Sequence, residues 1–234
     1  MFIRHLTLFA RDIKAQRLFY GQSLGLHLVA SSPRAFTVQA GSSRLTFEQS
    51  TGQEAPHYHF AFNIPENQLP EAKAWLQSRT SLLSKDGTDV FVFAPAWNAE
   101  GLYFLDQDGN VVEFIARHNL STSSQDPFGP QSLLCLSEMG LVVPEVAPVV
   151  DTLRQQVGLS VWQDAGPDFK ALGSETGLLI LVKETRPWFP TQLPATVSSF
   201  QAVLLKEGQK YQIMYTPEGL KISEFIPENV EIPA

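Results

Sequence analysis

Two histidines and one glutamate stand out because each lies in a short apolar segment typical of a β-strand. His5 lies in IRHLTLFARD, His59 in HYHFAFNI and Glu113 in DQDGNVVEFIAR. Burying an imidazole or a carboxylate without a partner is energetically costly, so each of these side chains needs a partner. Two histidines and one carboxylate can hold a divalent ion and leave coordination positions open for a substrate. We therefore expect a metal site at these three residues.

The composition favours a small molecule over nucleic acid or a membrane as partner. The 234 residues include 17 Lys and Arg against 24 Asp and Glu, which gives a formal net charge of −7. Binding to a phosphate backbone depends on Lys and Arg, which are scarce here. No apolar run approaches the roughly 20 residues of a membrane span, and charges at Arg4 and Arg11 argue against a signal peptide. With Cys135 as the only cysteine, we expect a cytoplasmic protein without an intrachain disulfide.

The expected elements repeat along the chain in the order β-α-β-β-β. One copy spans residues 2–50 and a second spans 57–117. In a third copy, the spacing of seven positions from Glu138 to Glu145 matches that from His5 to Asp12. The fourth copy is reduced, because the segment KEGQK between its first two expected strands is too short for a helix.

A polar segment divides the expected modules into two pairs. NLSTSSQDPFGPQS is rich in Ser, Pro and Gly, which is typical of a linker. We expect a metal-site domain of two paired modules at 1–120, a linker at 121–132 and a degenerate second domain of paired modules at 133–234. In that second domain, Glu138 holds the place of His5 and Gln201 is the nearest candidate in the fourth module. These two residues do not rebuild the metal triad, so we expect a structural role without metal for the second half.

Several short motifs follow one another in a fixed order within the first 118 residues. They are His5 with Asp12, Phe19-Tyr20, Leu24-Gly25-Leu26, His59-Phe-Ala-Phe, Tyr103-Phe104, Asp106-x-Asp108-Gly109-Asn110 and Glu113-Phe114. With them the chain resembles the vicinal oxygen chelate superfamily of glyoxalases, extradiol ring-cleaving dioxygenases, fosfomycin-resistance enzymes and bleomycin-binding proteins. The resemblance implies an α+β fold in which repeated β-α-β-β-β modules pair into curved mixed sheets around a cavity, with the helix missing from the fourth module.

The resemblance also implies metal ligands at His5, His59 and Glu113. The glyoxalase pattern has a fourth ligand, a glutamate on the last strand of the first module, where this chain reads SRLTFE. Glu48 is the candidate there if the strand register turns it toward the cavity, and Arg44 is a candidate anchor for an anionic substrate. If Glu48 does not reach the ion, three ligands remain, which suits a ferrous dioxygenase.

Other candidate residues lie around the expected cavity. Tyr103 and Glu48 are candidates for proton transfer. Trp97 and Asn98 are placed to stack on a planar substrate and to orient its oxygens. The run Arg186–Pro190 is either a lid or a packed connector, and we favour the connector.

Together these features predict a divalent-metal-dependent enzyme that acts on a small substrate with vicinal oxygens. One ion is expected, with Fe²⁺ favoured over Mn²⁺, Zn²⁺ or Ni²⁺, and extradiol-like ring cleavage is slightly preferred over a glyoxalase-like lyase or isomerase reaction. The alternative is a metal-free binding protein that sequesters a small molecule, as the bleomycin-resistance proteins do. We expect a monomer or a homodimer.

Overall fold

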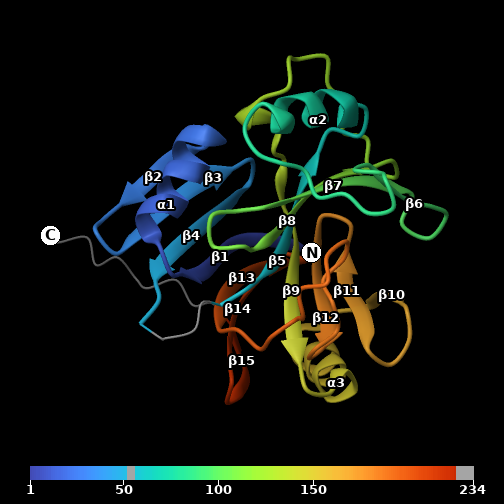
Figure 1. The fold of residues 1–234 in the computed structure, drawn as a ribbon. Helices are drawn as coiled ribbons and strands as arrows, with labels where there is room; N and C mark the ends of the chain where they lie inside the picture. Colours follow the sequence, from blue (N-terminus) through green and yellow to red (C-terminus); the bar gives the residue numbers. More distant parts are fainter. Residues whose placement is uncertain (52–55, 225–234) are drawn as a thin grey trace, which may run out of the picture.

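A single curved sheet organises the chain. The computed structural model describes residues 1–51 and 56–224, and over these residues fifteen strands form one sheet accompanied by three α-helices (Figure 1). None of the helices in the described part of the chain is long and apolar enough to cross a membrane. The α+β fold class and the repeated module order are confirmed.

Each of the first three modules has the predicted β-α-β-β-β order. The first consists of β1 (Phe2–Ala10), α1 (Ile13–Leu18), β2 (His27–Ser31), β3 (Ala35–Ala40) and β4 (Ser43–Gln49). The second consists of β5 (His59–Ile64), α2 (Leu69–Gln77), β6 (Phe91–Phe93), β7 (Ala99–Leu105) and β8 (Val111–Arg117). The third consists of β9 (Cys135–Val143), α3 (Val146–Val157), β10 (Val161–Asp164), β11 (Phe169–Ser174) and β12 (Gly177–Lys183).

The fourth module contains three antiparallel strands and no helix between them. It consists of β13 (Phe200–Lys206), β14 (Gln209–Thr216) and β15 (Gly219–Glu224). Glu207 and Gly208 form the tight turn between β13 and β14, both with positive φ. The sequence-based expectation of a module without its helix is confirmed.

The modules pair in an order that differs from the expected one. β5 of the second module runs antiparallel to β9 of the third, whereas β1 of the first runs antiparallel to β13 of the fourth. Between the two pairs of modules, β1 and β9 share one backbone pairing, Ile3 opposite Leu136. The division into paired-module units at 1–120 and 133–234 is therefore not the one that the strands make. A repeat pattern defines the modules but does not determine which modules pair.

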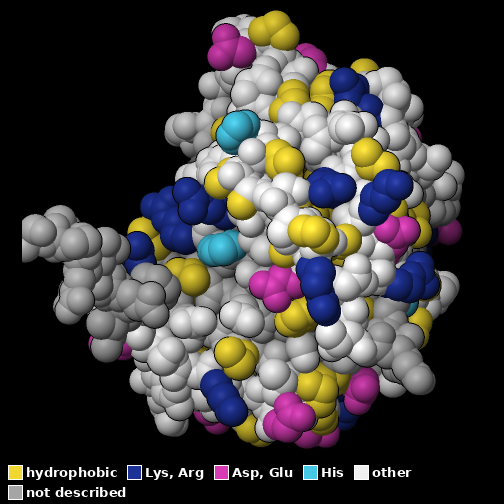
Figure 2. Space-filling view, turned by 90° about the vertical axis from the view of Figure 1, so that its left-hand side faces the viewer, with side chains coloured by type: hydrophobic (Ala, Val, Ile, Leu, Met, Phe, Trp, Pro, Cys, Tyr) yellow, Lys and Arg dark blue, Asp and Glu magenta, His cyan; other side chains and the backbone are white. Residues whose placement is uncertain are grey.

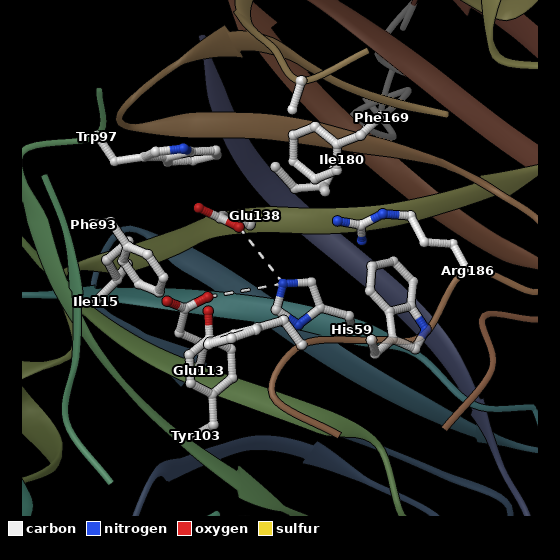
Figure 3. Close-up of a pocket in the computed structure, with 13 residues that line it drawn as sticks. His59, Phe93, Trp97, Tyr103, Glu113, Ile115, Glu138, Phe169, Ile180 and Arg186 are labelled. Atoms are coloured by element: carbon white, nitrogen blue, oxygen red, sulfur yellow. Dashed lines mark ion pairs between the residues drawn. The ribbon is translucent and has the colours of Figure 1, made fainter. Parts of the chain in front are cut away.

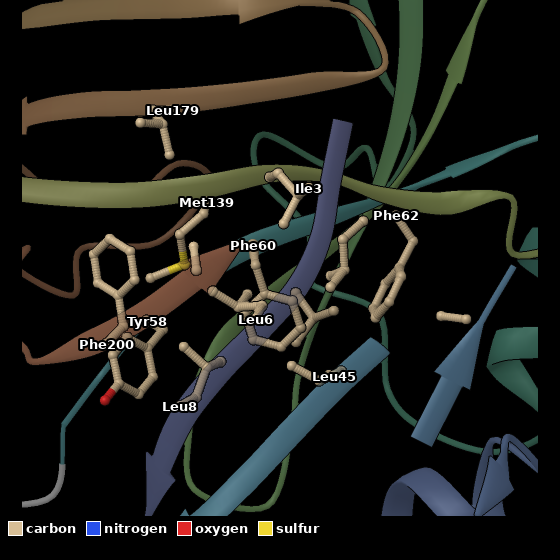
Figure 4. Close-up of a cluster of buried hydrophobic side chains, with 14 of the residues drawn as sticks. Ile3, Leu6, Leu8, Leu45, Tyr58, Phe60, Phe62, Met139, Leu179 and Phe200 are labelled. Atoms are coloured by element: carbon tan, nitrogen blue, oxygen red, sulfur yellow. The ribbon is translucent and has the colours of Figure 1, made fainter. Parts of the chain in front are cut away.

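Alternation along β5 separates a hydrophobic core from a polar site. Phe60 and Phe62 are fully buried in the main core, where Met139 of β9 joins them (Figure 4). His59 and Ala61 point to the opposite face, because successive side chains of a strand alternate. That second face is also covered, so every residue of β5 is buried. The sheet therefore carries the core on one side of β5 and a second, partly polar space on the other.

The turn Asp106–Asn110 ties the second module to the first. Asp108 accepts hydrogen bonds from the backbone nitrogens of Arg11 and Asp12, at 2.7 and 3.3 Å. Asp106 is buried and accepts a hydrogen bond of 2.9 Å from the Tyr20 hydroxyl. These contacts fix the start of α1 against the loop that leads into β8, and so help to position the strand that carries Glu113.

We predict that Asp108→Ala destabilises the protein by about 1–3 kcal/mol, because two backbone N–H groups lose their partner. Asp151→Ala, on the exposed side of α3, is the control and is expected to change stability by less than about 0.5 kcal/mol. Urea unfolding of both variants measures the difference. Equal stabilities for the two would show that the turn does not anchor α1.

On the face shown in Figure 2, the side chains of Lys and Arg are interspersed with acidic, apolar and uncharged atoms. They form no continuous basic stripe on the described part of that face.

Candidate metal centre

His59, Glu113 and Glu138 converge from three neighbouring strands. Each offers one ligand atom, and these atoms lie within 4.8 Å of one another. The strand register explains the convergence, because Ala61 of β5 lies opposite Glu113 of β8 on one side and opposite Glu138 of β9 on the other. His59 precedes Ala61 by two positions and so shares its face. Figure 3 shows the three side chains pointing toward one another.

The hydrogen bond of His59 orients its free nitrogen toward the carboxylates. Nδ1 lies 3.1 Å from the carbonyl oxygen of Val111. A carbonyl only accepts, so Nδ1 carries a proton and Nε2 is the ring nitrogen that faces the carboxyl groups. Nε2 is 3.8 Å from Glu113 Oε2 and 3.6 Å from Glu138 Oε2. The Nε2 nitrogen and two carboxyl groups therefore face one another, and a cation between them could bind to all three.

The charges at this cluster are unequally compensated. Glu138 pairs with the guanidinium of Arg117, which is fully buried and also donates from Nε to Asn63 Oδ1 at 3.1 Å. Glu113 is 2% exposed, and its Oε1 has no hydrogen-bond partner among the described residues. Burial, followed by the charge of Glu138, raises the pKa of Glu113 well above its usual value. A cation beside Glu113 would therefore compensate the charge of its carboxylate, and the residues present fit a divalent ion.

Tyr103 of β7 lies directly opposite Glu113 of β8. Burial, followed by the charges of Glu113 and Glu138, raises the pKa of the Tyr103 hydroxyl well above its usual value. The hydroxyl therefore keeps its proton at neutral pH and is available as a hydrogen-bond donor beside the cluster.

An apolar residue occupies the position where a fourth ligand would lie. Ala61 of β5 pairs with Glu113, and in the third module the corresponding residue, Gly140 of β9, pairs with Ile180 of β12. Ile180 lines the same cavity as the cluster. The described residues thus offer three protein ligands.

The structure brings together two of the three predicted ligands. His5 lies on β1, in the pair formed by the first and fourth modules, and its Nε2 is 2.8 Å from Thr46 Oγ1. Thr46 in turn contacts Thr37 Oγ1 at 2.7 Å. Thr46 holds in the first module the register position that Glu113 holds in the second. His5 is therefore not part of the cluster, and because the second module pairs with the third, Glu138 takes the place that we expected for His5.

The remaining predicted site residues are divided between the cavity and the surface. Trp97 and Tyr103 line the cavity. Glu48 and Arg44 are exposed on β4 and do not line it, because they belong to the other module pair. Asn98 is exposed and donates to Asn119 Oδ1 at 2.7 Å, away from the lining. These three residues are not placed to serve the cluster.

The segment Arg186–Pro190 contributes to the cavity as well as connecting β12 to β13. The Trp188 ring lies 5.0 Å from the ring of His59. A Cβ at Gly140 would fall 2.6 Å from the Trp188 ring, so the ring packs where only glycine leaves room. Arg186 also lines the cavity. Sequence analysis missed the roles of Glu138 and of this segment, although the match between Glu138 and His5 in their modules was the available signal.

A cavity of about 260 Å³ adjoins the cluster. Besides the three polar residues, it is lined mainly by apolar and aromatic side chains, with one arginine. These are Phe93, Trp97, Tyr103, Ile115, Ala165, Phe169, Ile180, Arg186, Trp188 and Phe189. The arrangement of polar groups at one wall of an apolar pocket is typical of a small-molecule site.

One family model and two solved structures are similar to this chain. Residues 2–114 match the family model of the Glyoxalase/Bleomycin resistance protein/Dioxygenase superfamily. A V278E mutant of glyoxalase I from Zea mays is similar in structure, with 14% identity and a TM-score of 0.55, over 93% of this chain and 89% of that one. A lactoylglutathione lyase from Agrobacterium tumefaciens has 19% identity and a TM-score of 0.41, over 48% of this chain and 91% of its own. No curated protein matched the sequence.

Proposed function

We propose that this chain, whose residues 2–114 match the family model of the Glyoxalase/Bleomycin resistance protein/Dioxygenase superfamily, is a divalent-metal-dependent enzyme that acts on a small substrate with vicinal oxygens. The observation that carries the proposal is the convergence of His59 Nε2 with the carboxylates of Glu113 and Glu138. His59, Glu113 and Glu138 would hold the ion. When bound, a divalent ion supplies Lewis-acid stabilisation of negative charge on substrate oxygens.

The surrounding residues prepare the site for such a substrate. Arg117 compensates Glu138, so the second carboxylate adds a ligand with little excess negative charge. Tyr103 holds its proton and is placed to donate to an oxygen that becomes negative during the reaction. Trp188 covers His59 and excludes water from one side of the cluster.

Three protein ligands and an aromatic cavity support ring-opening oxygenation over glyoxalase-like isomerisation. With Ile180 at the fourth position, the third module offers no carboxylate there to move a proton between substrate carbons. Three ligands leave open positions for a substrate and O₂, which suits Fe²⁺, while Mn²⁺, Zn²⁺ and Ni²⁺ are the other candidate ions.

Oxygen consumption tests this proposal. In one experiment, the protein is loaded anaerobically with Fe²⁺ and mixed with catechols in oxygen-saturated buffer. In a second experiment, the Zn²⁺- or Ni²⁺-loaded protein is given hemithioacetals of 2-oxoaldehydes. We expect O₂ uptake with ring-opened products and no isomerisation. Isomerisation without O₂ uptake would reverse the choice of reaction, and metal uptake with neither reaction would count against an enzyme.

Sequestration without metal is the second candidate function, and the aromatic lining of the cavity is what favours it. A protein of this kind would bind its aromatic ligand equally well with and without a divalent ion. Titration of the ligand into chelator-treated and metal-loaded protein separates the two functions.

The raised pKa of Glu113 predicts a pH dependence of stability. In metal-free protein the folded state binds the Glu113 proton more tightly than the unfolded state, so folding stability is lost as the pH rises above the unfolded-state value of 4.5 toward the folded-state value. Relative to the wild type, Glu113→Gln should therefore be more stable at pH 8 and gain less at pH 5. Urea unfolding in chelator at both pH values measures this, and an equal difference at the two would contradict it.

A further inference from the structure

Arg186 is a cation on the wall of the cavity that has no carboxylate partner within ion-pair distance among the described residues. Its side chain makes no ion pair and no hydrogen bond with the described residues, and its guanidinium lies 5.0 Å above the ring of Phe169. In Figure 3 the guanidinium extends from the connector into the space near Glu138 and Ile180. Arg117, the other cationic group near the cluster, is by contrast fully buried and already paired with Glu138.

The surroundings of Arg186 compensate its charge only in part. It is half-buried, and burial lowers its pKa, with the charge of Asp168 acting in the opposite direction. An arginine stays protonated in proteins, so the cost of removing it from water is recovered when an anion binds. The Arg186 guanidinium is therefore the donor on the connector that is available to a ligand in the cavity.

The size and lining of the cavity restrict the ligand. Six aromatic side chains line it: Phe93, Trp97, Tyr103, Phe169, Trp188 and Phe189. An apolar cavity of about 150 Å³ is known to hold benzene, so the volume of about 260 Å³ accommodates one aromatic ring with a few substituents. Aromatic walls favour a planar ring through offset or edge-to-face contacts.

We propose that the substrate is a monocyclic aromatic carboxylate, with its carboxylate bound by Arg186 and its vicinal oxygens directed at His59, Glu113 and Glu138. The orientation of the oxygens rests on the proposed function, whereas recognition of the carboxylate rests on Arg186 and the aromatic walls. The planar guanidinium matches a carboxylate through two parallel N–H···O bonds. The connector therefore acts as the element that determines specificity.

Binding of three matched catechols tests the proposal. The probes are 3,4-dihydroxybenzoate, catechol and 3,4-dihydroxybenzylamine, which share the ring and its two hydroxyls and differ in charge. Calorimetric titration uses the full chain, metal-free and loaded with Zn²⁺, as wild type, Arg186→Gln, Arg186→Lys and the control Arg34→Gln. Arg34 is exposed and does not line the cavity.

We expect the wild type to bind the benzoate at least about tenfold more tightly than catechol and to bind the amine most weakly. Arg186→Gln should lose about 10- to 100-fold in affinity for the benzoate and keep its affinity for catechol within about threefold. Arg186→Lys should recover part of the loss, since it keeps the charge without the planar pair of donors. Arg34→Gln should match the wild type.

A wild type without preference for the benzoate, or an Arg186→Gln variant that weakens all three probes equally, would overturn the proposal. The metal-free titrations separate it from the proposed function. A preference for aromatic carboxylates that depends on Arg186 in a protein that takes up no Zn²⁺ would support the role of Arg186 and refute the metal-dependent enzyme.

Discussion

Replacing any one of His59, Glu113 and Glu138 is expected to abolish tight binding of a divalent ion. Each residue supplies one of three ligand atoms that lie within 4.8 Å of one another, and no fourth carboxylate occupies the position of Ile180 to compensate. With three ligands, the loss of one leaves two, too few to fix the ion. We therefore predict that His59→Ala and Glu138→Gln each weaken metal binding at least about 100-fold.

His5→Ala is the matched control for this prediction. The sequence resemblance implied the same role for His5 as for His59, but the structure places it in the pair formed by the first and fourth modules, hydrogen-bonded to Thr46. The variant should therefore bind metal as the wild type does. Calorimetric titration with Mn²⁺ or Zn²⁺ measures the metal affinity of the wild type and of the His59→Ala, Glu138→Gln and His5→Ala variants. Loss of binding in His5→Ala, with binding kept in Glu138→Gln, would contradict the assignment of the ligands.

Removing Arg117 is expected to cause the largest loss of stability. Arg117 is 1% exposed and pairs with Glu138, which is 4% exposed. Breaking a buried ion pair by removing one partner costs about 3–5 kcal/mol, because the remaining charge is left buried without compensation. Arg117→Met should therefore lower the free energy of unfolding by this amount in chelator at pH 7.

The double variant Arg117→Met/Glu138→Gln separates charge from packing. If the uncompensated charge of Glu138 causes the loss, removing it should recover about 1–2 kcal/mol of the stability that Arg117→Met loses. Urea unfolding of the wild type, both single variants and the double variant gives this coupling. Purely additive losses would mean that Arg117 stabilises through its contacts with Asn63, Trp97 and Trp162 instead.

The modules and two of the three ligands could be predicted from the sequence because they depend on local patterns. The apolar, strand-like segments around His59 and Glu113 marked both as polar side chains that need a partner, and module matching located Glu138 at the position of His5. These inferences require only the periodicity of a strand and the spacing between strand and helix.

The pairing of modules could not be predicted, because it depends on contacts between strands far apart in sequence. Met139 of β9 lies opposite Phe60 of β5, and Ala202 of β13 lies opposite Leu6 of β1. All four are apolar residues on core faces, so either pairing satisfies the same hydrophobic pattern. Because the second module pairs with the third, Glu138 and not His5 lies beside His59 and Glu113. Glu48 and Arg44 belong to the other module pair and lie away from the site.

The contribution of the connector Arg186–Pro190 to the cavity could not be predicted from sequence patterns either. Arg186 and Trp188 lie in a segment without periodicity, and their place at the cavity follows from how that segment crosses the face of β9. Gly140 follows no pattern that marks it out in its strand, and its role in leaving room for Trp188 follows only from the packing.

Anomalous diffraction from crystals grown with Mn²⁺ tests the central claim most directly. The account predicts one strong anomalous peak within coordination distance of His59 Nε2 and of carboxylate oxygens of Glu113 and Glu138. A peak at His5, or a protein saturated with Mn²⁺ in solution whose crystals have no peak among these three side chains, would contradict it.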